Sequence, residues 1–169
     1  MVLSGEKIFI NTGSVPVIPP MDGIRESKRV FFSESILELE ELPEKLVIIG
    51  GGYIGLEFAS FYRMFGSEVT VLQNTPDFIP REDRDIAQAV YEEMVRQGIR
   101  FVFNADICRI HDEGRQTAVD YILDGQEYAA RADAVLVATG RKPNTAGLNL
   151  EAAGVELLPR GGVKTDAQR

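Results

Sequence analysis

The stretch that decides the fold is LVIIGGGYIG, residues 46–55, in which an apolar run passes directly into closely spaced glycines. A continuous aliphatic run of this kind is typical of a strand buried on both faces of a parallel sheet. Gly50, Gly52 and Gly55 fit the spacing G-x-G-x-x-G of a dinucleotide-binding turn. The helix expected over residues 53–65 completes the strand, turn and helix that this motif requires, which disfavours an ordinary glycine loop.

Each glycine of this turn has its own expected role. Gly50 permits the tight turn, Gly52 lets backbone N–H groups approach a pyrophosphate, and Gly55 allows the helix to pack closely on the strand. The amino end of the helix adds a partial positive charge that suits phosphate groups. The sequence therefore predicts a Rossmann-like site for NADH or NADPH.

The remaining patterns predict an α/β fold with a Rossmann-like parallel sheet, flanking helices and an inserted antiparallel β ribbon. The expected architecture is a doubly wound α/β domain, in which helices and a β ribbon flank the parallel sheet. The expected strands of the body are residues 7–11, 46–49, 68–72, 99–103 and 134–138. The expected ribbon strands are residues 106–111, 116–123 and 127–130, and the expected helices are residues 33–41, 53–65 and 83–97, with a further short one near Leu150.

Two of these helices carry apolar residues at helical spacing, which predicts the faces that they bury. The first stripe is Ile54, Phe58, Phe61, Tyr62 and Phe65, and the second is Ile86, Ala89, Val90 and Met94. In the helix of residues 33–41, Ser33 is the expected cap.

Composition and charge narrow the partners and the location. The 169 residues are enough for one compact domain, and the formal net charge of -8 disfavours nucleic acid as a partner. Cys108 is the only cysteine, so no disulfide can form within the chain. The apolar runs are too short for a membrane span, and no secretion signal is visible at the start. A cytoplasmic location is expected by default.

The residues after the second strand bear on the choice between NADH and NADPH. Gln73 and Asn74 stand where an acidic residue normally holds the adenosine ribose. A carboxylate would repel a 2'-phosphate, whereas these neutral amides can hydrogen-bond either cofactor. Arg81 could meet a 2'-phosphate, or it could pair with Glu82 or Asp85. The balance leans slightly towards NADPH.

For Glu57 and Tyr53, near the turn, the sequence allows two interpretations each. Glu57 could hydrogen-bond the nicotinamide amide or hold a lysine, or it could simply contact the helix dipole. Tyr53 could belong to the core, but a residue inside a glycine turn more often borders the ligand. Cys108 and His111 lack a second thiol or a visible base, so they are assigned no chemistry.

Two motifs together resemble one family. Residues 50–57 read GGGYIGLE, and residues 137–145 read VATGRKPNT. With INTGSVP at residues 10–16, they resemble the pyridine nucleotide-disulfide oxidoreductases of the glutathione reductase, dihydrolipoamide dehydrogenase and mercuric reductase type. The resemblance covers essentially the whole chain. FIPREDRDI, residues 78–86, is most similar to mercuric reductase and to relatives linked with oxidant or metal resistance.

The resemblance implies that NAD(P)H binds here and passes a hydride to FAD, which then reduces a disulfide in a C-x4-C motif. One cysteine cannot form that motif, so this chain is expected to be an excised NAD(P)-binding domain of residues 1–169. Residues 1–30 and 141–169 would be flanking segments that join an absent FAD domain. The remainder of its own chain is then the main partner, and the full-length enzyme is expected to be a homodimer. The isolated domain is expected to be inactive and free of FAD.

Site residues also follow from the resemblance. Tyr53 would gate the nicotinamide pocket, and Glu57 would contact its nicotinamide end. Gln73 and Asn74 would face the adenosine ribose, and Ile107 would lie against adenine. Residues counted as cofactor-binding beside these are Gly50, Gly52, Ile54, Gly55, Arg81, Thr139 and Gly140, the last two with backbone near the nicotinamide ribose. Residues 12–13 and 141–144 would border FAD.

Two other classes of protein also use such a turn. A regulatory NAD(H)-sensing Rossmann module would bind the cofactor without catalysis, but the ATGRKPN and NTGS segments disfavour it, because a sensor has no flavin to border. A methyltransferase that binds S-adenosylmethionine is disfavoured by the third glycine and by the missing ribose acid. The electron acceptor is not identifiable from these residues.

Overall fold

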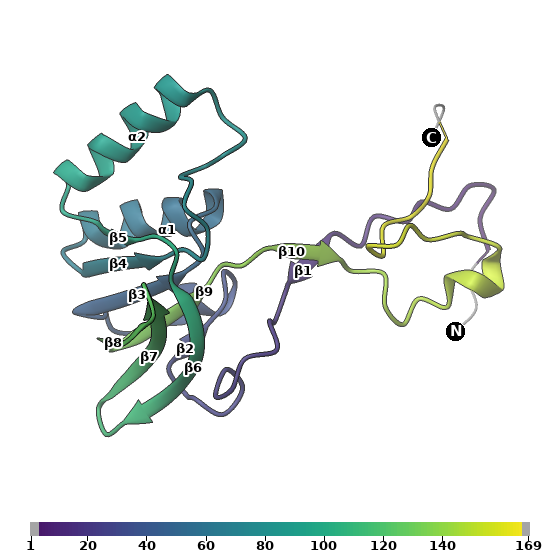
Figure 1. The fold of residues 1–169 in the computed structure, drawn as a ribbon. Coiled ribbons are helices and arrows are strands. Elements are labelled where there is room, and N and C mark those ends of the chain that lie inside the picture. Colours follow the sequence, from purple (N-terminus) through teal and green to yellow (C-terminus); the bar gives the residue numbers. More distant parts are fainter. Residues whose placement is uncertain (1–3, 167–169) are drawn as a thin grey trace. The chain divides into compact units, whose positions relative to one another are not determined.

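The structure is a computed structural model that describes residues 4–166 (Figure 1). The chain divides into two compact units. The larger unit is Val17–Gly140, and the smaller unit combines the residues before Val17 with those after Gly140. Each unit is considered by itself.

The larger unit contains the predicted parallel sheet. Its five strands lie in the order β2, β9, β3, β4, β5, and every neighbouring pair is parallel. Their bounds are β2 Val30–Phe31, β9 Ala134–Val137, β3 Lys45–Ile49, β4 Glu68–Leu72 and β5 Arg100–Val102. β3 lies at the centre, because its four apolar residues are buried and it pairs on both sides, as the aliphatic run predicted.

The two faces of this sheet carry different covers. Helices α1 (Tyr53–Met64) and α2 (Arg84–Arg96) lie on the same face (Figure 1). The other face packs against the ribbon of β6 (Asp106–Glu113), β7 (Gln116–Leu123) and β8 (Gln126–Ala132). The predicted parallel sheet with flanking helices and an antiparallel ribbon is therefore confirmed, and it is the ribbon that covers the second face.

Alternation along the strands supplies both cores. Leu46 and Ile48 of β3 face the helices, while Val47 and Ile49 face the ribbon. In β9, Leu136 faces the helices and Val135 the ribbon in the same way. Because successive side chains of a strand point to opposite faces, a strand with two covered faces must be apolar throughout.

The two predicted helices form, but their buried faces differ from the apolar stripes. In α1 the buried residues are Gly55, Leu56, Ala59 and Tyr62, and Phe61 and Phe65 are exposed. Small residues let the helix approach the sheet closely, so they lie at the contact although their apolar signal is weak.

In α2 the contact row is Ala87, Tyr91 and Met94, and Ile86 and Val90 are exposed. Tyr91 packs on Phe78 and Phe101, with ring centroids 5.5 and 5.4 Å away. These ring contacts place α2 about one residue away from the predicted stripe.

Three further predictions concern short elements outside the main sheet and the two long helices. Residues 7–11 pair with no other strand in the described part of the chain, so the predicted strand there is wrong. The element near Ser33 is only a 3-10 turn, η1 (Ser35–Glu38), which begins after Glu34, so Ser33 is not its cap. The short helix near Leu150 is confirmed as the 3-10 turn η2 (Leu150–Ala153).

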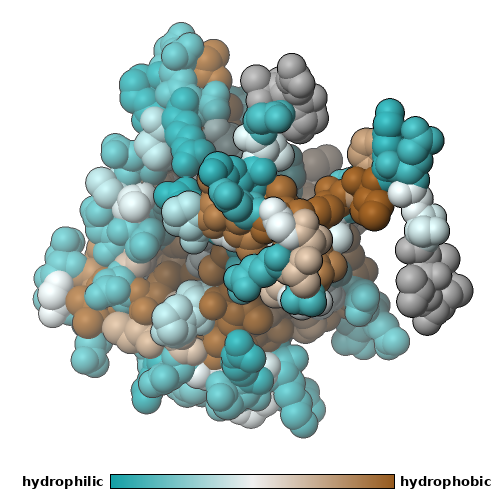
Figure 2. Space-filling view, turned by 90° about the vertical axis from the view of Figure 1, so that its right-hand side faces the viewer, coloured by the Kyte–Doolittle hydropathy of each residue, from teal (hydrophilic) through white to brown (hydrophobic). Residues whose placement is uncertain are grey.

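The smaller unit is built around one strand pair, β1 (Ser14–Pro16) with β10 (Arg141–Pro143), in antiparallel register. The face seen in Figure 2 carries apolar surface, in brown, beside hydrophilic segments. The exposed large apolar residues of this unit are Ile8, Phe9, Ile10, Leu148, Leu157 and Leu158. This unit therefore leaves much of its apolar surface uncovered.

Candidate dinucleotide-binding site

The glycine turn lies at the carboxyl ends of three neighbouring strands. Gly50 follows β3, and its N–H donates to the carbonyl of Leu72 at the end of β4, at 2.9 Å. The N–H of Ala138, just after β9, donates to the carbonyl of Ile49 at 2.8 Å. In open parallel sheets this end of the strands is where ligands bind.

Two of the three motif glycines are required by close backbone approaches. Gly50 has φ of +108°, and a Cβ there would lie 2.6 Å from the carbonyl oxygen of Ala138. At Gly55 a Cβ would lie only 2.1 Å from the carbonyl oxygen of Gly50. Any larger residue at either position would push the backbone apart, because real Cβ contacts are never this short.

Gly52 differs from them, because nothing lies within 4 Å of the place where its Cβ would be. Gly52 caps α1 with extended backbone, at φ -80° and ψ 178°, and its carbonyl accepts the N–H of Leu56 at 2.9 Å. The first N–H groups of a helix have no partner within the helix. An open space therefore lies beside unpaired donors, which is the arrangement that binds phosphate.

Gln73 is tied to this turn through its side chain. Its Oε1 accepts the N–H of Gly51 at 2.7 Å, and its Nε2 donates to Oγ1 of Thr75 at 2.6 Å. Asn74, the other predicted ribose contact, is exposed. The contact between Thr75 and Gln73 was not predicted from the sequence. The one feature that could have indicated it is a hydroxyl side chain two residues after Gln73.

Tyr53 is held by Glu82, which the sequence offered as one of several possible partners of Arg81. The Tyr53 hydroxyl donates to the carboxylate of Glu82, and this hydrogen bond raises the pKa of Tyr53 above the ordinary tyrosine value. Within residues 4–166, Arg81 makes no ion pair with Glu82 or Asp85, and its charge acts on Tyr53. The loop of residues 74–83 thus reaches over the amino end of α1.

Arg84 fixes the path of that loop. Its guanidinium donates to the carbonyl oxygens of Ile79 and Glu82, at 2.7 and 2.8 Å, and more weakly to that of Phe78. Ile79 is buried and has φ of +34°, an unfavourable angle for a branched residue. Several contacts therefore hold one particular loop conformation.

The other predicted site residues are less closely connected to the turn. Thr139 is near it, because a Cβ on Gly50 would lie 3.3 Å from the Thr139 nitrogen. Gly140 accepts the N–H of Val17 at 2.9 Å. Ile54 is half-buried, Glu57 is exposed on α1, and Ile107 packs against the core beneath the ribbon. Among residues 4–166, no hydrogen bond or ion pair joins the side chain of Glu57 or of Ile107 to the turn.

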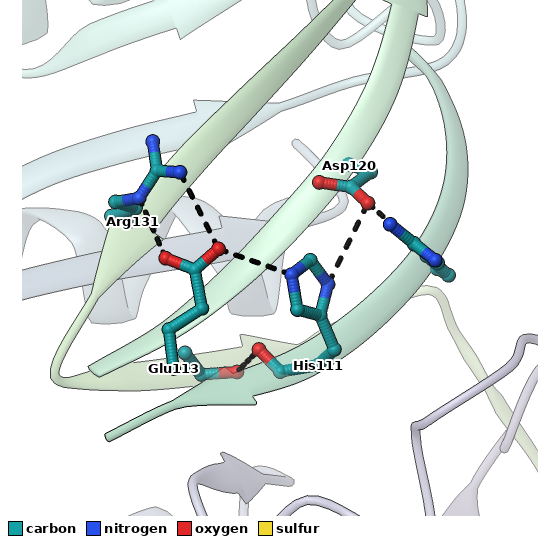
Figure 3. Close-up of polar contacts among 6 residues, drawn as sticks. His111, Glu113, Asp120 and Arg131 are labelled. Atoms are coloured by element: carbon teal, nitrogen blue, oxygen red, sulfur yellow. Dashed lines mark hydrogen bonds and ion pairs between the residues drawn. The ribbon is translucent and has the colours of Figure 1, made fainter. Parts of the chain in front are cut away.

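A charged cluster occupies the outer face of the ribbon (Figure 3). His111 lies between two carboxylates, with Nε2 3.1 Å from Glu113 and Nδ1 3.5 Å from Asp120. Arg131 pairs with Glu113, and Arg109 pairs with Asp120, at 2.7 and 2.6 Å. His111 therefore has acidic neighbours that the sequence did not reveal, but they are neutralised by two arginines. Cys108 has no other cysteine in the chain, and no three-residue metal site occurs among the described residues.

A cleft of about 260 Å³ lies between the sheet and the ribbon, lined by Lys45, Thr70, Arg100 and Tyr121 among others. It lies at the amino ends of β3, β4 and β5, opposite the end that holds the glycine turn. It is therefore separate from the candidate site. No helix in the described part of the chain is long and apolar enough to cross a membrane.

A parallel sheet with flanking helices, a glycine turn at its carboxyl end and a ribbon on one face defines an α/β domain with a Rossmann-like sheet. Residues 2–169 match the family described as pyridine nucleotide-disulphide oxidoreductase. The chain belongs to that family.

Curated relatives support the same assignment. The chain is 46% identical over 165 residues to a probable pyridine nucleotide-disulfide oxidoreductase, RclA, of Escherichia coli, covering 97% of this chain and 36% of the relative. It is 37% identical to a mercuric reductase of Staphylococcus aureus, covering 97% and 30%. A dihydrolipoyl dehydrogenase of Chlamydia trachomatis is 38% identical, covering 98% and 35%. The chain thus spans about a third of the length of these relatives.

A solved structure agrees with the fold. It is described as HOCl-induced flavoprotein disulfide reductase RclA from Escherichia coli, and it is 44% identical to this chain. The TM-score is 0.89, over 97% of this chain and 37% of that one.

Proposed function

We propose that this chain is the NAD(P)H-binding part of a flavin-dependent reductase, which positions the nicotinamide so that a hydride can pass to FAD. The observation that carries the proposal is the open space at Gly52, beside the unpaired N–H groups that begin α1. A diphosphate fits this position both sterically and electrostatically. The descriptions of the relatives as flavoprotein and pyridine nucleotide-disulfide reductases favour the same cofactors.

Within this proposal the described residues hold and orient the cofactor. The turn from Gly50 to Gly55 would bind the diphosphate, Gln73 and Asn74 would lie beside the adenosine ribose, and Thr139 would lie near the other ribose. Tyr53 and Glu57 would border the nicotinamide. FAD, when bound, would accept the hydride.

The smaller unit would contribute to the flavin side. Its β1 follows Gly13 of the first motif, and its β10 lies within the second motif and ends just before Asn144. The N–H of Asn144 donates to the carbonyl of Gly13 at 2.9 Å. The exposed apolar residues of this unit need a cover, since isolated proteins rarely expose such patches. We propose that an FAD domain of the same polypeptide provides that cover.

Calorimetric titration with NADH, NADPH and S-adenosylmethionine tests the cofactor. We expect weak binding of a nicotinamide dinucleotide and no tighter binding of S-adenosylmethionine. Gly52→Val should weaken the nicotinamide by at least about tenfold, because its side chain fills the diphosphate space. Gly162→Val is the matched control, because Gly162 lies in the smaller unit and its Cβ would meet only ordinary contacts at 3.8 Å.

Tighter binding of S-adenosylmethionine would overturn the proposal. So would nicotinamide binding that Gly52→Val and Gly162→Val leave equally unchanged.

A further inference from the structure

We infer that Gln73 is a neutral clamp on the glycine turn, set in place by Thr75, and that it offers the cofactor an N–H donor where a carboxylate would offer a negative charge. The clamp is the chain of contacts Gly51–Gln73–Thr75. The part of this inference that concerns the cofactor rests on the proposed function. The part that concerns the turn can be tested on the protein alone.

The orientation of the Gln73 amide is fixed by its partners. The backbone N–H of Gly51 can only donate, so the side-chain atom 2.7 Å away must be the carbonyl oxygen. The amide nitrogen then points to Thr75, whose Oγ1 accepts at 2.6 Å. A threonine hydroxyl can accept or donate, so it stabilises this orientation once Gly51 has selected it.

The backbone of Gln73 is fixed as well. Its N–H donates to the carbonyl of Val102 at 2.8 Å, and its carbonyl accepts the N–H of Ala105 at 3.0 Å. The side chain therefore starts from a rigid point at the end of β4. Gly51 is buried, so its N–H would lose a partner if Gln73 were shortened. These contacts hold the turn in one conformation before any ligand arrives.

The same orientation decides what the cofactor meets. An amide nitrogen carries two N–H groups, and Thr75 uses one of them. The second can donate to a ribose 2'-hydroxyl or to a 2'-phosphate, since both present acceptor oxygens. A glutamate could keep both clamp contacts, because it accepts from Gly51 and from the Thr75 hydroxyl. It would, however, bring a negative charge to the 2' position. The clamp therefore allows both cofactors, and Glu at this position would disfavour NADPH.

Amide hydrogen exchange of Gly51, followed by NMR in the cofactor-free protein, tests the clamp. Exchange should be at least about tenfold slower in the unmodified chain than in Gln73→Ala, since a lost hydrogen bond of about 1.4 kcal/mol corresponds to tenfold. Gln73→Glu and Thr75→Ser should keep the protection, and Thr75→Val should lose part of it. Asp77→Asn, an exposed change in the same loop, is the control and should leave the exchange unchanged.

Calorimetry on the same variants tests the charge. Gln73→Glu should shift the affinity ratio against NADPH by five- to 150-fold, whereas Gln73→Ala should weaken NADH and NADPH alike. Gly51 exchange that is equally fast in the unmodified chain and in Gln73→Ala would overturn the clamp. An unchanged cofactor ratio in Gln73→Glu would overturn the role of the neutral donor. Protection of Gly51 without binding of either cofactor would support the clamp and reject the proposed function instead.

Discussion

At the scale of the residue, one added methyl group should destabilise the fold more at Gly55 than at Gly52. Gly55→Ala places a Cβ 2.1 Å from the Gly50 carbonyl oxygen, so the helix or the turn must move. We expect a loss of about 1 to 3 kcal/mol in the free energy of unfolding, as for other overpacked sites. Gly52→Ala meets no atom within 4 Å and should cost less than about 1 kcal/mol.

Denaturant unfolding of the two variants measures this difference. Equal stability of Gly55→Ala and the unmodified chain would show that the turn and α1 are not packed as described.

Arg81 offers a second single-residue prediction, on cofactor choice. It makes no ion pair with Glu82 or Asp85 within residues 4–166, which leaves its guanidinium available for a 2'-phosphate. Arg81→Ala should therefore weaken NADPH by about 1 to 3 kcal/mol and leave NADH nearly unchanged. Arg115→Ala, at the exposed tip of the ribbon, is the control. Equal losses for both cofactors would assign Arg81 a structural role.

Spacing predicted the turn, but it could not predict the contacts around it. The three motif glycines and the position of Gln73 follow from local sequence. The partners of these residues do not, since Gly51 and Gln73 are 22 residues apart and Tyr53 and Glu82 are 29 apart. Those pairs depend on the path of the loop after β4, which Arg84 and the unusual backbone of Ile79 determine.

At the scale of the element, the ribbon is joined to the segment before β2 by a carboxylate. Ser27 donates its hydroxyl to Asp112 of β6 at 2.6 Å, and the N–H of Lys28 donates weakly to the same carboxylate. The Ser27 hydrogen bond is the main cause that lowers the pKa of Asp112 below its ordinary value. A lowered pKa in the folded state means that this contact stabilises the fold above the unfolded pKa, and that the contribution is lost as pH falls through the folded value.

Ser27→Ala should consequently raise the pKa of Asp112 towards the ordinary value of 3.8. Carbon-detected NMR titration of the Asp112 carboxyl measures it. Ser60→Ala in α1 serves as the control and should leave this titration curve unchanged. A pKa that does not rise in Ser27→Ala would contradict the hydrogen bond as its cause.

Element bounds proved easier to predict than element faces. The strands β3 and β4 and the helix α1 begin and end within a residue or two of the predicted positions. The contact faces of α1 and α2 were displaced, because Gly55 and Ala59 in one helix and Tyr91 in the other decide how the helix lies. Hydrophobicity alone gives such small or half-polar residues little weight.

At the scale of the whole molecule, the content of these 169 residues leads to a prediction about flavin. The purified chain of 169 residues should carry no FAD and show no reductase activity, since its one cysteine cannot form a redox-active pair and its glycine turn at residues 50–55 is the proposed NAD(P)H site. Visible absorption is the measurement, because the conjugated rings of a bound flavin absorb visible light. A flavin band that survives gel filtration would contradict the expectation.

The overall class was predictable, and the layering was not. An apolar central strand requires two covers, but its sequence does not say whether a helix or a ribbon provides the second one. The alternating residues of β7, such as Val119 and Tyr121, pack on the sheet, so the ribbon serves as a cover and not as an outlying hairpin. Ile8 and Phe9 likewise have an apolar pattern that predicted a strand, but they are exposed and form none.

The two ends of the larger unit meet, since the N–H of Val17 donates to the carbonyl of Gly140 and the Thr139 hydroxyl approaches the Val17 carbonyl. A segment whose termini touch can be inserted into a host through a single loop without stretching either protein. Residues 17–140 are thus suited to transplantation as a portable cassette. Placed in an exposed loop of an unrelated carrier, they should unfold cooperatively as a separate transition in calorimetry, and a merged or missing transition would show that the cassette depends on its original surroundings.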